Sequence, residues 1–267
     1  MDLLEFWRAA LMGLVEGLTE FLPVSSTGHL ILLSDFLGFE GPGNHLFEIV
    51  IQLGAILAVC WLYWGRLFGV VKTLFSERRS QVFTRNLLLA FLPSMVIGAM
   101  AYGTIKAHLM NSTVVAIMLI VGGVAILVIE RMVKHPRYHD IEEMPAATAF
   151  KIGLFQCVSM IPGVSRAGAT IMGALLVGVE RKAAAEFSFF LAIPTMVAAT
   201  VYDLYKNRDA LTPDGMEIIA VGFIVAFFSA LVVVKLFIGF VSRYGFAPFA
   251  WYRIVIGALM LGLIFLG

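Results

Sequence analysis

The chain has 267 residues, of which 60% are hydrophobic and only 14% are charged. A soluble domain carries about 25% charged residues, so this composition excludes a protein with an ordinary water-exposed surface and indicates an integral membrane protein. The net charge of +1 gives no indication of nucleic-acid binding. Because the apolar stretches have the length of helical spans and do not alternate with a period of two, we expect an all-α polytopic membrane protein.

Two apolar stretches are interrupted in their middle, and six others are long enough to cross a bilayer, which takes about 20 residues. Proline and glycine in mid-segment indicate a break between two shorter helices. The interrupted stretches are 1–37, around Pro23 and Gly28, and 148–178, around Pro162, Gly163 and Gly168. The expected transmembrane helices are 45–64, 86–105, 113–132, 184–203, 216–238 and 251–267. We therefore expect a single membrane domain, 1–267, in which three spans follow each interrupted stretch.

Basic residues are distributed unevenly between the two sides of this layout. If each interrupted stretch returns the chain to the side from which it came, 14 of the 19 basic residues fall on one side: Arg66, Lys72, Arg78, Arg79, Arg85, Arg131, Lys134, Arg137, Lys151, Arg181, Lys182, Lys235, Arg243 and Arg253. The other side receives Arg8, Lys106, Lys206 and Arg208, and Arg166 falls inside the second break. The positive-inside rule then places the basic side in the cytoplasm and both termini outside.

A weak internal repeat relates the two interrupted stretches. At a constant offset of 140 residues, GLVEGLTEFLPVSSTG, which starts at Gly13, aligns with GLFQCVSMIPGVSRAG, which starts at Gly153. The halves, about 1–133 and 148–267, each contain one interrupted stretch and three spans. An odd number of crossings per half inverts the second copy in the membrane, which is the inverted-repeat plan of proteins with a site near the bilayer midplane.

The polar residues in the two breaks need partners, because a charge near the bilayer centre costs at least about 2.5–3.5 kcal/mol. The first break offers Glu16, Glu20 and His29, and the second offers Arg166. Two fully spanning hairpins would place their tips at opposite faces, where these groups could not meet. We therefore expect two re-entrant helical hairpins whose tips converge.

The chemistry of these residues favours a site for phosphate and a metal ion. A helix-like run follows each break, and the free N–H groups of a helix N-terminus bind phosphate. Arg166 can add a bidentate contact to phosphoryl oxygens. Glu16 and Glu20 are four residues apart and face the same way on a helix, an arrangement suited to a divalent cation such as Mg²⁺ or Ca²⁺. The combination predicts phosphoryl transfer or hydrolysis.

Two motifs then identify a family. EGLTEFLPVSSTGH, residues 16–29, and PGVSRAGAT, residues 162–170, closely resemble the signature motifs of the bacterial undecaprenyl-diphosphate phosphatases. These are integral membrane enzymes that regenerate the lipid carrier of cell-wall synthesis and confer bacitracin resistance. The resemblance covers nearly the whole chain, including FEIVIQLGAILAV and EFSFFLAIP. The sequence departs from the second motif at Ala167, where the family usually has a second serine, so one potential phosphate donor is missing.

The resemblance, together with the residue chemistry, assigns expected roles. The family pattern is matched at Glu16, Glu20, Ser26, His29, Ser165, Arg166 and Thr170. We expect Glu20, Ser26, His29 and Arg166 to be catalytic, Glu16 and Glu20 to hold the metal, and Ser25, Thr27, Gly163, Ser165 and Thr170 to bind the substrate. Ser26 is the expected nucleophile, with the adjacent glutamate or His29 accepting its proton. A metal-bound water attacking in its place is the alternative.

The family also predicts the partner and its location. The substrate is a polyprenyl diphosphate whose lipid tail lies among the apolar spans of a bacterial inner-membrane protein. Its diphosphate is expected to enter from the outer, periplasmic side. The sequence is compatible with a homodimer.

Other readings of the same residues exist. Glu16 and Glu20 could form a purely structural ion pair with Arg166, His29 could be an ordinary interior histidine, and Ser25, Ser26 and Thr27 are good helix caps. A transporter or flippase for a polyprenyl phosphate could use the same midplane phosphate site. An ion channel is disfavoured, because no span carries a repeated polar stripe. We favour the enzyme, because two glutamates would weaken a site that only bound anions.

Overall fold

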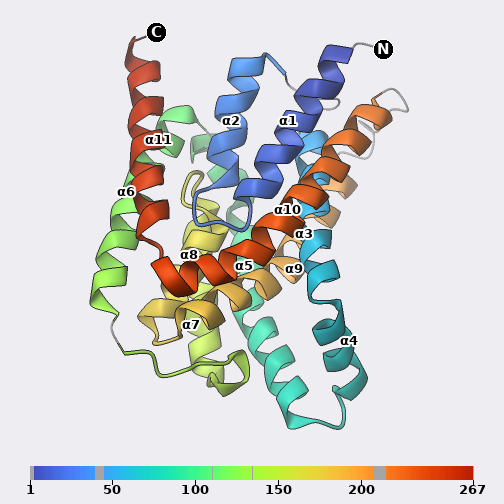
Figure 1. Ribbon diagram of the computed structural model, residues 1–267, viewed down its shortest axis with the longest axis vertical. Helices are drawn as coiled ribbons and strands as arrows, with labels where there is room; N and C mark the ends of the chain where they lie inside the picture. The colour runs from blue at the N-terminus through green and yellow to red at the C-terminus, as the bar shows by residue number, and fades with distance from the viewer. Residues whose placement is uncertain (1–2, 40–44, 110, 134, 207–214, 267) are drawn as a thin grey trace.

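The computed structural model describes all residues except 1–2, 40–44, 110, 134, 207–214 and 267 (Figure 1). The described residues form eleven α-helices and two short 3-10 helices. The helices are α1 (Leu3–Thr19), α2 (Ser26–Leu37), α3 (His45–Leu62), α4 (Trp64–Thr73), α5 (Arg78–Leu109), α6 (Ser112–Met132), η1 (Ile141–Glu143), α7 (Ala146–Cys157), η2 (Val158–Met160), α8 (Arg166–Leu176), α9 (Arg181–Lys206), α10 (Met216–Tyr244) and α11 (Ala247–Leu266). The expected all-α class is confirmed.

The expected spans correspond to helices long and apolar enough to cross a membrane. Within the described part of the chain, five single helices meet this standard, namely α5, α6, α9, α10 and α11. The sixth is α3 together with α4, which qualify as a pair but are bent by 70° at their junction. Counting this bent pair as one span gives the six expected crossings of a polytopic membrane protein.

Ion pairs hold helix α4 at an angle to α3. Arg66, in its first turn, donates to Glu142 and to Glu186, each at 3.1 Å. Trp64 and Phe68 stack on each other and remain largely exposed. An exposed aromatic pair beside a fixed cation is common where a span reaches the membrane surface.

The two interrupted stretches form helical hairpins whose tips meet inside the molecule. Helices α1 and α2 are separated by residues 20–25, and η2 and α8 by residues 161–165. The tips touch where the Ser165 hydroxyl lies 3.4 Å from the carbonyl oxygen of Leu22. In Figure 1 one hairpin descends from the end that carries both termini and the other rises from the opposite end. This is the convergence expected of re-entrant hairpins.

The breaks are shorter than the sequence suggested. Gly28 and Gly168, which were expected to border them, lie inside the first turns of α2 and α8. At Gly28 a Cβ atom would come within 3.2 Å of Val115 and 3.3 Å of Leu119 on α6. Glycine at this position therefore serves close helix packing rather than the break itself.

The 140-residue offset also relates contacts in the structure. Helix α1 packs against α10, and its equivalent α7 packs against α5, which is the equivalent of α10. Gly13 and Gly153 occupy the same position in the two pairs. A Cβ on Gly13 would overlap the carbonyl of Gly222, and one on Gly153 would overlap the carbonyl of Ala90. The shared glycine thus allows the same close approach of backbones in each half.

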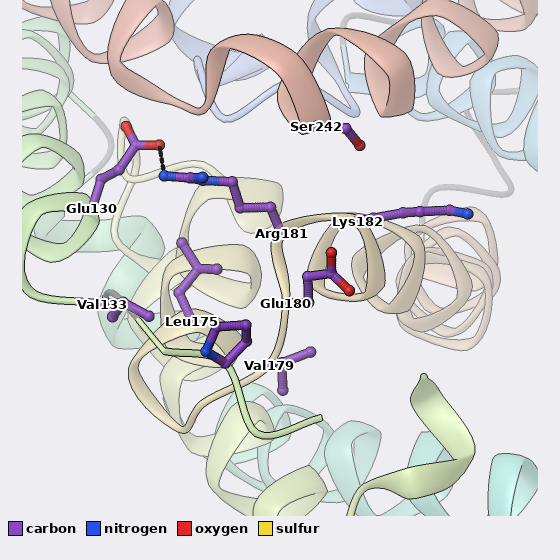
Figure 2. A pocket seen from close by; sticks show the side chains of 9 residues that line it. Glu130, Val133, Leu175, Val179, Glu180, Arg181, Lys182 and Ser242 are labelled. Carbon is purple, nitrogen blue, oxygen red and sulfur yellow. Dashed lines mark ion pairs between the residues drawn. The ribbon is translucent and has the colours of Figure 1, made fainter. Parts of the chain in front are cut away.

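A cavity of about 180 Å³ lies between the end of α6, the start of α9 and Ser242 of α10 (Figure 2). On its rim Glu130, near the end of α6, forms an ion pair with Arg181 at 3.1 Å. The same carboxylate oxygen accepts the backbone N–H of Phe246 at 2.8 Å. Glu130 therefore joins α6 to the start of α9 and to the turn between α10 and α11.

Candidate active site

A serine with an unusual backbone conformation precedes the second helix of each hairpin. Ser25 has φ of 69° and Ser165 has φ of 77°, and they are the non-glycine residues with positive φ in the described part of the chain. Such a conformation costs of the order of 1–3 kcal/mol and persists only where the surroundings enforce it. The two serines are 140 residues apart, so the same backbone turn aims the first residues of α2 and α8 into the centre.

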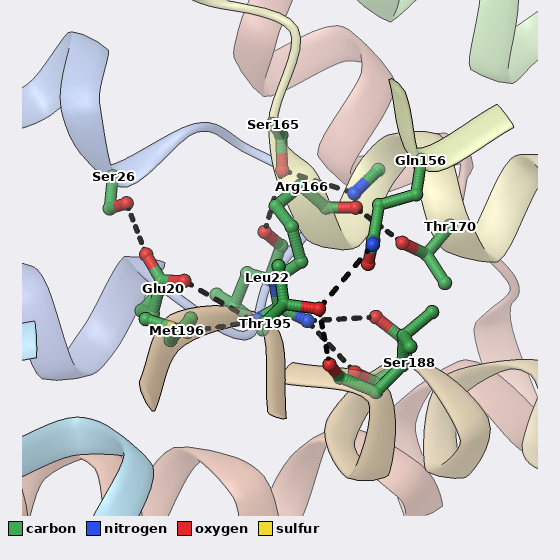
Figure 3. A network of polar contacts seen from close by, with 12 residues as sticks. Glu20, Leu22, Ser26, Gln156, Ser165, Arg166, Thr170, Ser188, Thr195 and Met196 are labelled. Atoms are coloured by element: carbon green, nitrogen blue, oxygen red, sulfur yellow. Dashed lines mark hydrogen bonds and ion pairs between the residues drawn. The ribbon is translucent and has the colours of Figure 1, made fainter. Parts of the chain in front are cut away.

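Glu20 lies between the two residues that begin these helices (Figure 3). The Ser26 hydroxyl donates to Glu20 Oε2 at 2.5 Å, and Arg166 Nη2 donates to Glu20 Oε1 at 3.2 Å. The Glu20 side chain is 7% exposed and that of Arg166 is 12% exposed. The predicted meeting of the two breaks thus takes the form of a buried carboxylate shared by a hydroxyl and a guanidinium.

Arg166 is fixed from α9 and retains one free donor. Its Nη1 donates to the Ser188 carbonyl at 2.8 Å and lies 3.2 Å from the Ser188 hydroxyl. The guanidinium also lies over the ring of Phe21, with its central carbon 5.6 Å from the ring centre. The Nε–H is buried and has no hydrogen-bond partner among the described residues. A planar cation with an unused donor is suited to a phosphoryl oxygen.

Glu16 is fully buried, one turn before Glu20, and neither of its carboxylate oxygens has a hydrogen-bond partner in the described structure. An unpaired buried carboxylate is costly and requires a proton or a cation. Glu16 could therefore hold the expected metal ion or carry a proton. Glu20 is less suited to a metal ion, because its two oxygens already bind Ser26 and Arg166. No cluster of three or more His, Cys, Asp or Glu side chains suited to a metal ion occurs among the described residues.

His29 does not face Ser26. Its Nδ1 lies 2.8 Å from the carbonyl oxygen of Ser25, and its Nε2 lies 2.7 Å from the hydroxyl of Tyr252 on α11. The two rings are stacked, with an interplanar angle of 2°. Because a carbonyl only accepts, Nδ1 must carry a hydrogen. In this arrangement the base beside Ser26 is Glu20, and His29 supports the strained backbone of Ser25.

The expected substrate-binding residues divide into two groups. Ser165 and Thr170 use their hydroxyls within α8, since Ser165 Oγ accepts the Gly168 N–H at 3.1 Å and Thr170 Oγ1 donates to the Arg166 carbonyl at 2.8 Å. Gly163 adopts φ of 91° and places its backbone against α6. By contrast, α2 has no side-chain cap on its N-terminus, which contains Ser25, Ser26 and Thr27. Its first N–H groups are the ones left for a phosphate.

Arg253 is a central residue that the sequence analysis misplaced. It was counted among the cytoplasmic basic residues, but it lies within α11 and is only 1% exposed. Its five N–H groups donate at 2.8–3.2 Å to five carbonyl oxygens, those of Pro23, Met118, Leu119, Gly163 and Val164. Pro23 and Val164 belong to different breaks, so one guanidinium joins both. Of the other basic residues, Lys134 on that side and Arg208 on the opposite side lie outside the described residues.

Comparison with known proteins identifies the family of the chain. The model of the bacitracin resistance protein BacA family matches residues 9–259. The chain belongs to this family. Undecaprenyl-diphosphatase 2 of Paramagnetospirillum magneticum is 62% identical over 257 residues, which cover 96% of this chain and 98% of that protein. Undecaprenyl-diphosphatase of Sphingopyxis alaskensis is 60% identical over 248 residues, 92% of this chain and 93% of that protein.

A third relative is the undecaprenyl-diphosphatase of Cereibacter sphaeroides. It is 52% identical over 260 residues, 97% of each chain. The BacA match includes both breaks and α11 as far as residue 259, so the residues of the candidate site and Arg253 lie within the matched region.

Proposed function

We propose that this BacA-family protein hydrolyses undecaprenyl diphosphate to undecaprenyl phosphate and phosphate. The names of its relatives support this reaction, and one observation in the structure supports the chemistry. Glu20 accepts a hydrogen bond from the Ser26 hydroxyl while the Arg166 cation holds its other oxygen. The pair resembles a nucleophile and its base, beside a fixed positive charge.

In the proposed first step, Ser26 Oγ attacks the terminal phosphorus. A bond forms between this oxygen and phosphorus, the bond to the bridging oxygen breaks, and the Ser26 proton passes to Glu20. Undecaprenyl phosphate leaves. In the second step water attacks the phosphorus of the phosphoserine and the bond from phosphorus to Ser26 Oγ breaks. Ser26 Oγ takes back the proton held by Glu20, and phosphate leaves with the protons of the water. Attack by water without a phosphoserine is the alternative.

Charge that builds up on the phosphoryl oxygens is offset by donors already in place. The donors proposed for these oxygens are the Nε–H of Arg166, which is buried and has no partner among the described residues, and the uncapped N–H groups of α2. Preorganised donors in a site shielded from water account for much of the catalysis of phosphoryl transfer. Ser165 and Thr170 contribute by shaping the start of α8.

We extend the proposal to a divalent cation, Mg²⁺ or Ca²⁺, held by Glu16 with the substrate diphosphate as co-ligand. When bound, such a cation neutralises charge on the diphosphate. The unpaired oxygens of Glu16 support this placement. Glu16→Gln should therefore weaken the dependence on added metal, whereas Glu20→Gln should lower turnover at every metal concentration.

The deciding experiment measures phosphate release from undecaprenyl diphosphate in detergent, with excess chelator or with added Mg²⁺ or Ca²⁺. We expect metal-dependent release by the wild type and a loss of about 10²-fold or more for Ser26→Ala. A phosphorylated Ser26 recovered after rapid quenching would support the covalent route. Near-normal turnover of Ser26→Ala would leave water as the attacking group. Binding of the lipid without phosphate release would favour a flippase.

We also place the protein in the bacterial inner membrane, with the site open to the outer side. The layout supports this, because both termini lie at the end from which the first hairpin descends, and the loops rich in basic residues lie at the other. A lipid diphosphate at the outer face would then reach the tips through that half of the molecule.

A further inference from the structure

Gln156, near the end of α7, is a buried residue of the second hairpin that the proposed reaction does not use. It is only 1% exposed. Its Nε2 donates to Ser94 Oγ at 2.7 Å and lies 3.4 Å from Thr195 Oγ1 (Figure 3). Ser94 belongs to α5 and Thr195 to α9. One side-chain amide therefore joins α7 to two other helices.

The protons of the two hydroxyls fix the orientation of the Gln156 amide. Ser94 Oγ donates to the carbonyl oxygen of Phe91 at 2.9 Å, and Thr195 Oγ1 donates to that of Leu191 at 2.7 Å. Because a hydroxyl has a single proton, both hydroxyls can only accept from Gln156, which presents its NH₂ group to them. The amide oxygen is buried and has no partner among the described residues. The contact thus requires a donor at this position, and a carboxylate could not make it.

Each of these hydroxyls follows a proline inside its helix. Pro93 precedes Ser94 in α5, and Pro194 precedes Thr195 in α9. A proline has no N–H, so the carbonyl four residues earlier loses its helical partner and the helix is less constrained there. In membrane helices, neighbouring helices and polar side chains compensate for this loss. Gln156 thus connects α5 and α9 at the points where their own backbone hydrogen bonds are interrupted.

The same section of α9 holds the Arg166 guanidinium. Its Nη1 donates to the carbonyl oxygen of Ser188, before the proline, and its Nη2 lies 3.7 Å from the Sδ of Met196, after the proline. Met196 directly follows Thr195, the residue that Gln156 contacts (Figure 3). A change in the direction of α9 at the proline would therefore move one anchor of the guanidinium relative to the other. The Nε–H proposed for a phosphoryl oxygen would move with them.

We propose that Gln156 is a positioning residue for Arg166 and acts through Thr195 and α9 without touching the substrate. The inference rests on the proposed function, which assigns the phosphoryl oxygens to Arg166. Gln156 stands 140 residues after Glu16, at the equivalent position of the repeat. An amide can donate where an ionised carboxylate cannot, so the two halves use this position differently.

Binding of inorganic diphosphate to the full-length protein in detergent, measured by isothermal titration calorimetry, tests this without turnover. Gln156→Met keeps the length of the side chain but removes its donors. It should raise the dissociation constant about tenfold, the order of one hydrogen bond to a charged group. Thr195→Val should weaken binding in the same direction, and Thr195→Ser, which keeps the hydroxyl, should restore it. Thr73→Val is the matched control, because the Thr73 hydroxyl also bonds to a carbonyl four residues earlier but lies at the end of α4.

A double-mutant cycle separates positioning from a general loss of stability. If Gln156 acts through Arg166, Gln156→Met should change the dissociation constant less than twofold in an Arg166→Lys background. A tenfold effect in both backgrounds would overturn the proposal, and so would unchanged binding by folded Gln156→Met and Thr195→Val. If the wild type released no phosphate but Gln156→Met still weakened diphosphate binding through Arg166, hydrolysis would be rejected and the positioning role would stand.

Discussion

At the scale of single residues, His29 is the residue whose surroundings most change its expected role. Its ring nitrogens are committed to the Ser25 carbonyl and the Tyr252 hydroxyl, so it holds the backbone that presents Ser26. We expect His29→Asn to retain activity within about tenfold of wild type, because the asparagine amide can replace Nδ1–H. His29→Ala, which has no donor, should lose more. Steady-state kinetics of phosphate release across pH checks this.

If His29 instead transferred protons, its variants would show a different pattern of activity loss. A general acid or base contributes about 10²–10⁴-fold, and asparagine cannot replace it. Equal and large losses for His29→Asn and His29→Ala, with one limb of the pH profile removed in both, would show that His29 transfers protons. Tyr244→Phe, at an exposed tyrosine of α10, is a control for Tyr252→Phe, which should resemble a mild form of His29→Ala.

The sequence predicted that polar side chains of the two breaks would meet where their chemistry was unusual for their surroundings. Glu20, Ser26 and Arg166 are polar groups in an apolar chain, and each needed a partner that the other break could supply. The direction in which each side chain points was harder to predict. Whether Ser26 faces Glu20 or His29 depends on the positive φ of Ser25, and no local pattern in the sequence indicates that conformation for a serine.

At the scale of helices and hairpins, Arg253 determines how the two breaks sit together. The sequence placed it at the membrane surface because the span was predicted to begin at 251, whereas α11 begins at Ala247. That shift of about one turn moves the residue from the start of the span deeper into the helix and the interior. One feature of the sequence did indicate a buried role for Arg253. It lies in an apolar run, where an arginine is costly unless all its N–H groups are hydrogen-bonded. Its partners lie 89 to 230 positions away in the chain, so no local pattern identifies them.

We expect Arg253→Met to lower the thermal stability strongly, because it leaves five buried carbonyls without their donor, at a cost of about 1–3 kcal/mol for each one that water cannot reach. Arg253→Lys should restore little, since an ammonium has three donors in place of five. Arg243→Met, at an exposed arginine near the end of α10, is the control. Thermal unfolding in detergent measures the effect. Equal midpoints for Arg253→Met and Arg243→Met would contradict the proposal that Arg253 holds the two breaks together.

At the scale of the whole molecule, the number and order of spans followed from composition and length, and the packing of the halves did not. A weak alignment suggested the repeat, but the equivalence of the α1–α10 and α7–α5 pairs depends on backbone contact at Gly13 and Gly153. Glycine is common in apolar sequences, so its spacing alone could not predict these contacts.

The orientation in the membrane is the prediction that belongs to this scale. In a background without Cys60 and Cys157, a cysteine at Asp35, near the end with the termini, should react with a thiol reagent that cannot cross membranes. A cysteine at Glu77, at the opposite end, should react only after the membrane is permeabilised. Both native positions are exposed, so access is not limited by burial. Labelling of intact cells at Glu77 and not at Asp35 would reverse the orientation.

The matched serines at the two tips have a consequence for the ancestry of the fold. Ser26 and Arg166, which follow Ser25 and Ser165, are themselves 140 residues apart, and both bind Glu20. A dimer of identical half-length chains would carry the same residue at both places, either two hydroxyls or two cations. Only after duplication and fusion could one copy supply the nucleophile and the other its positive charge. The fold retains a twofold plan, and its chemistry requires that the twofold be broken.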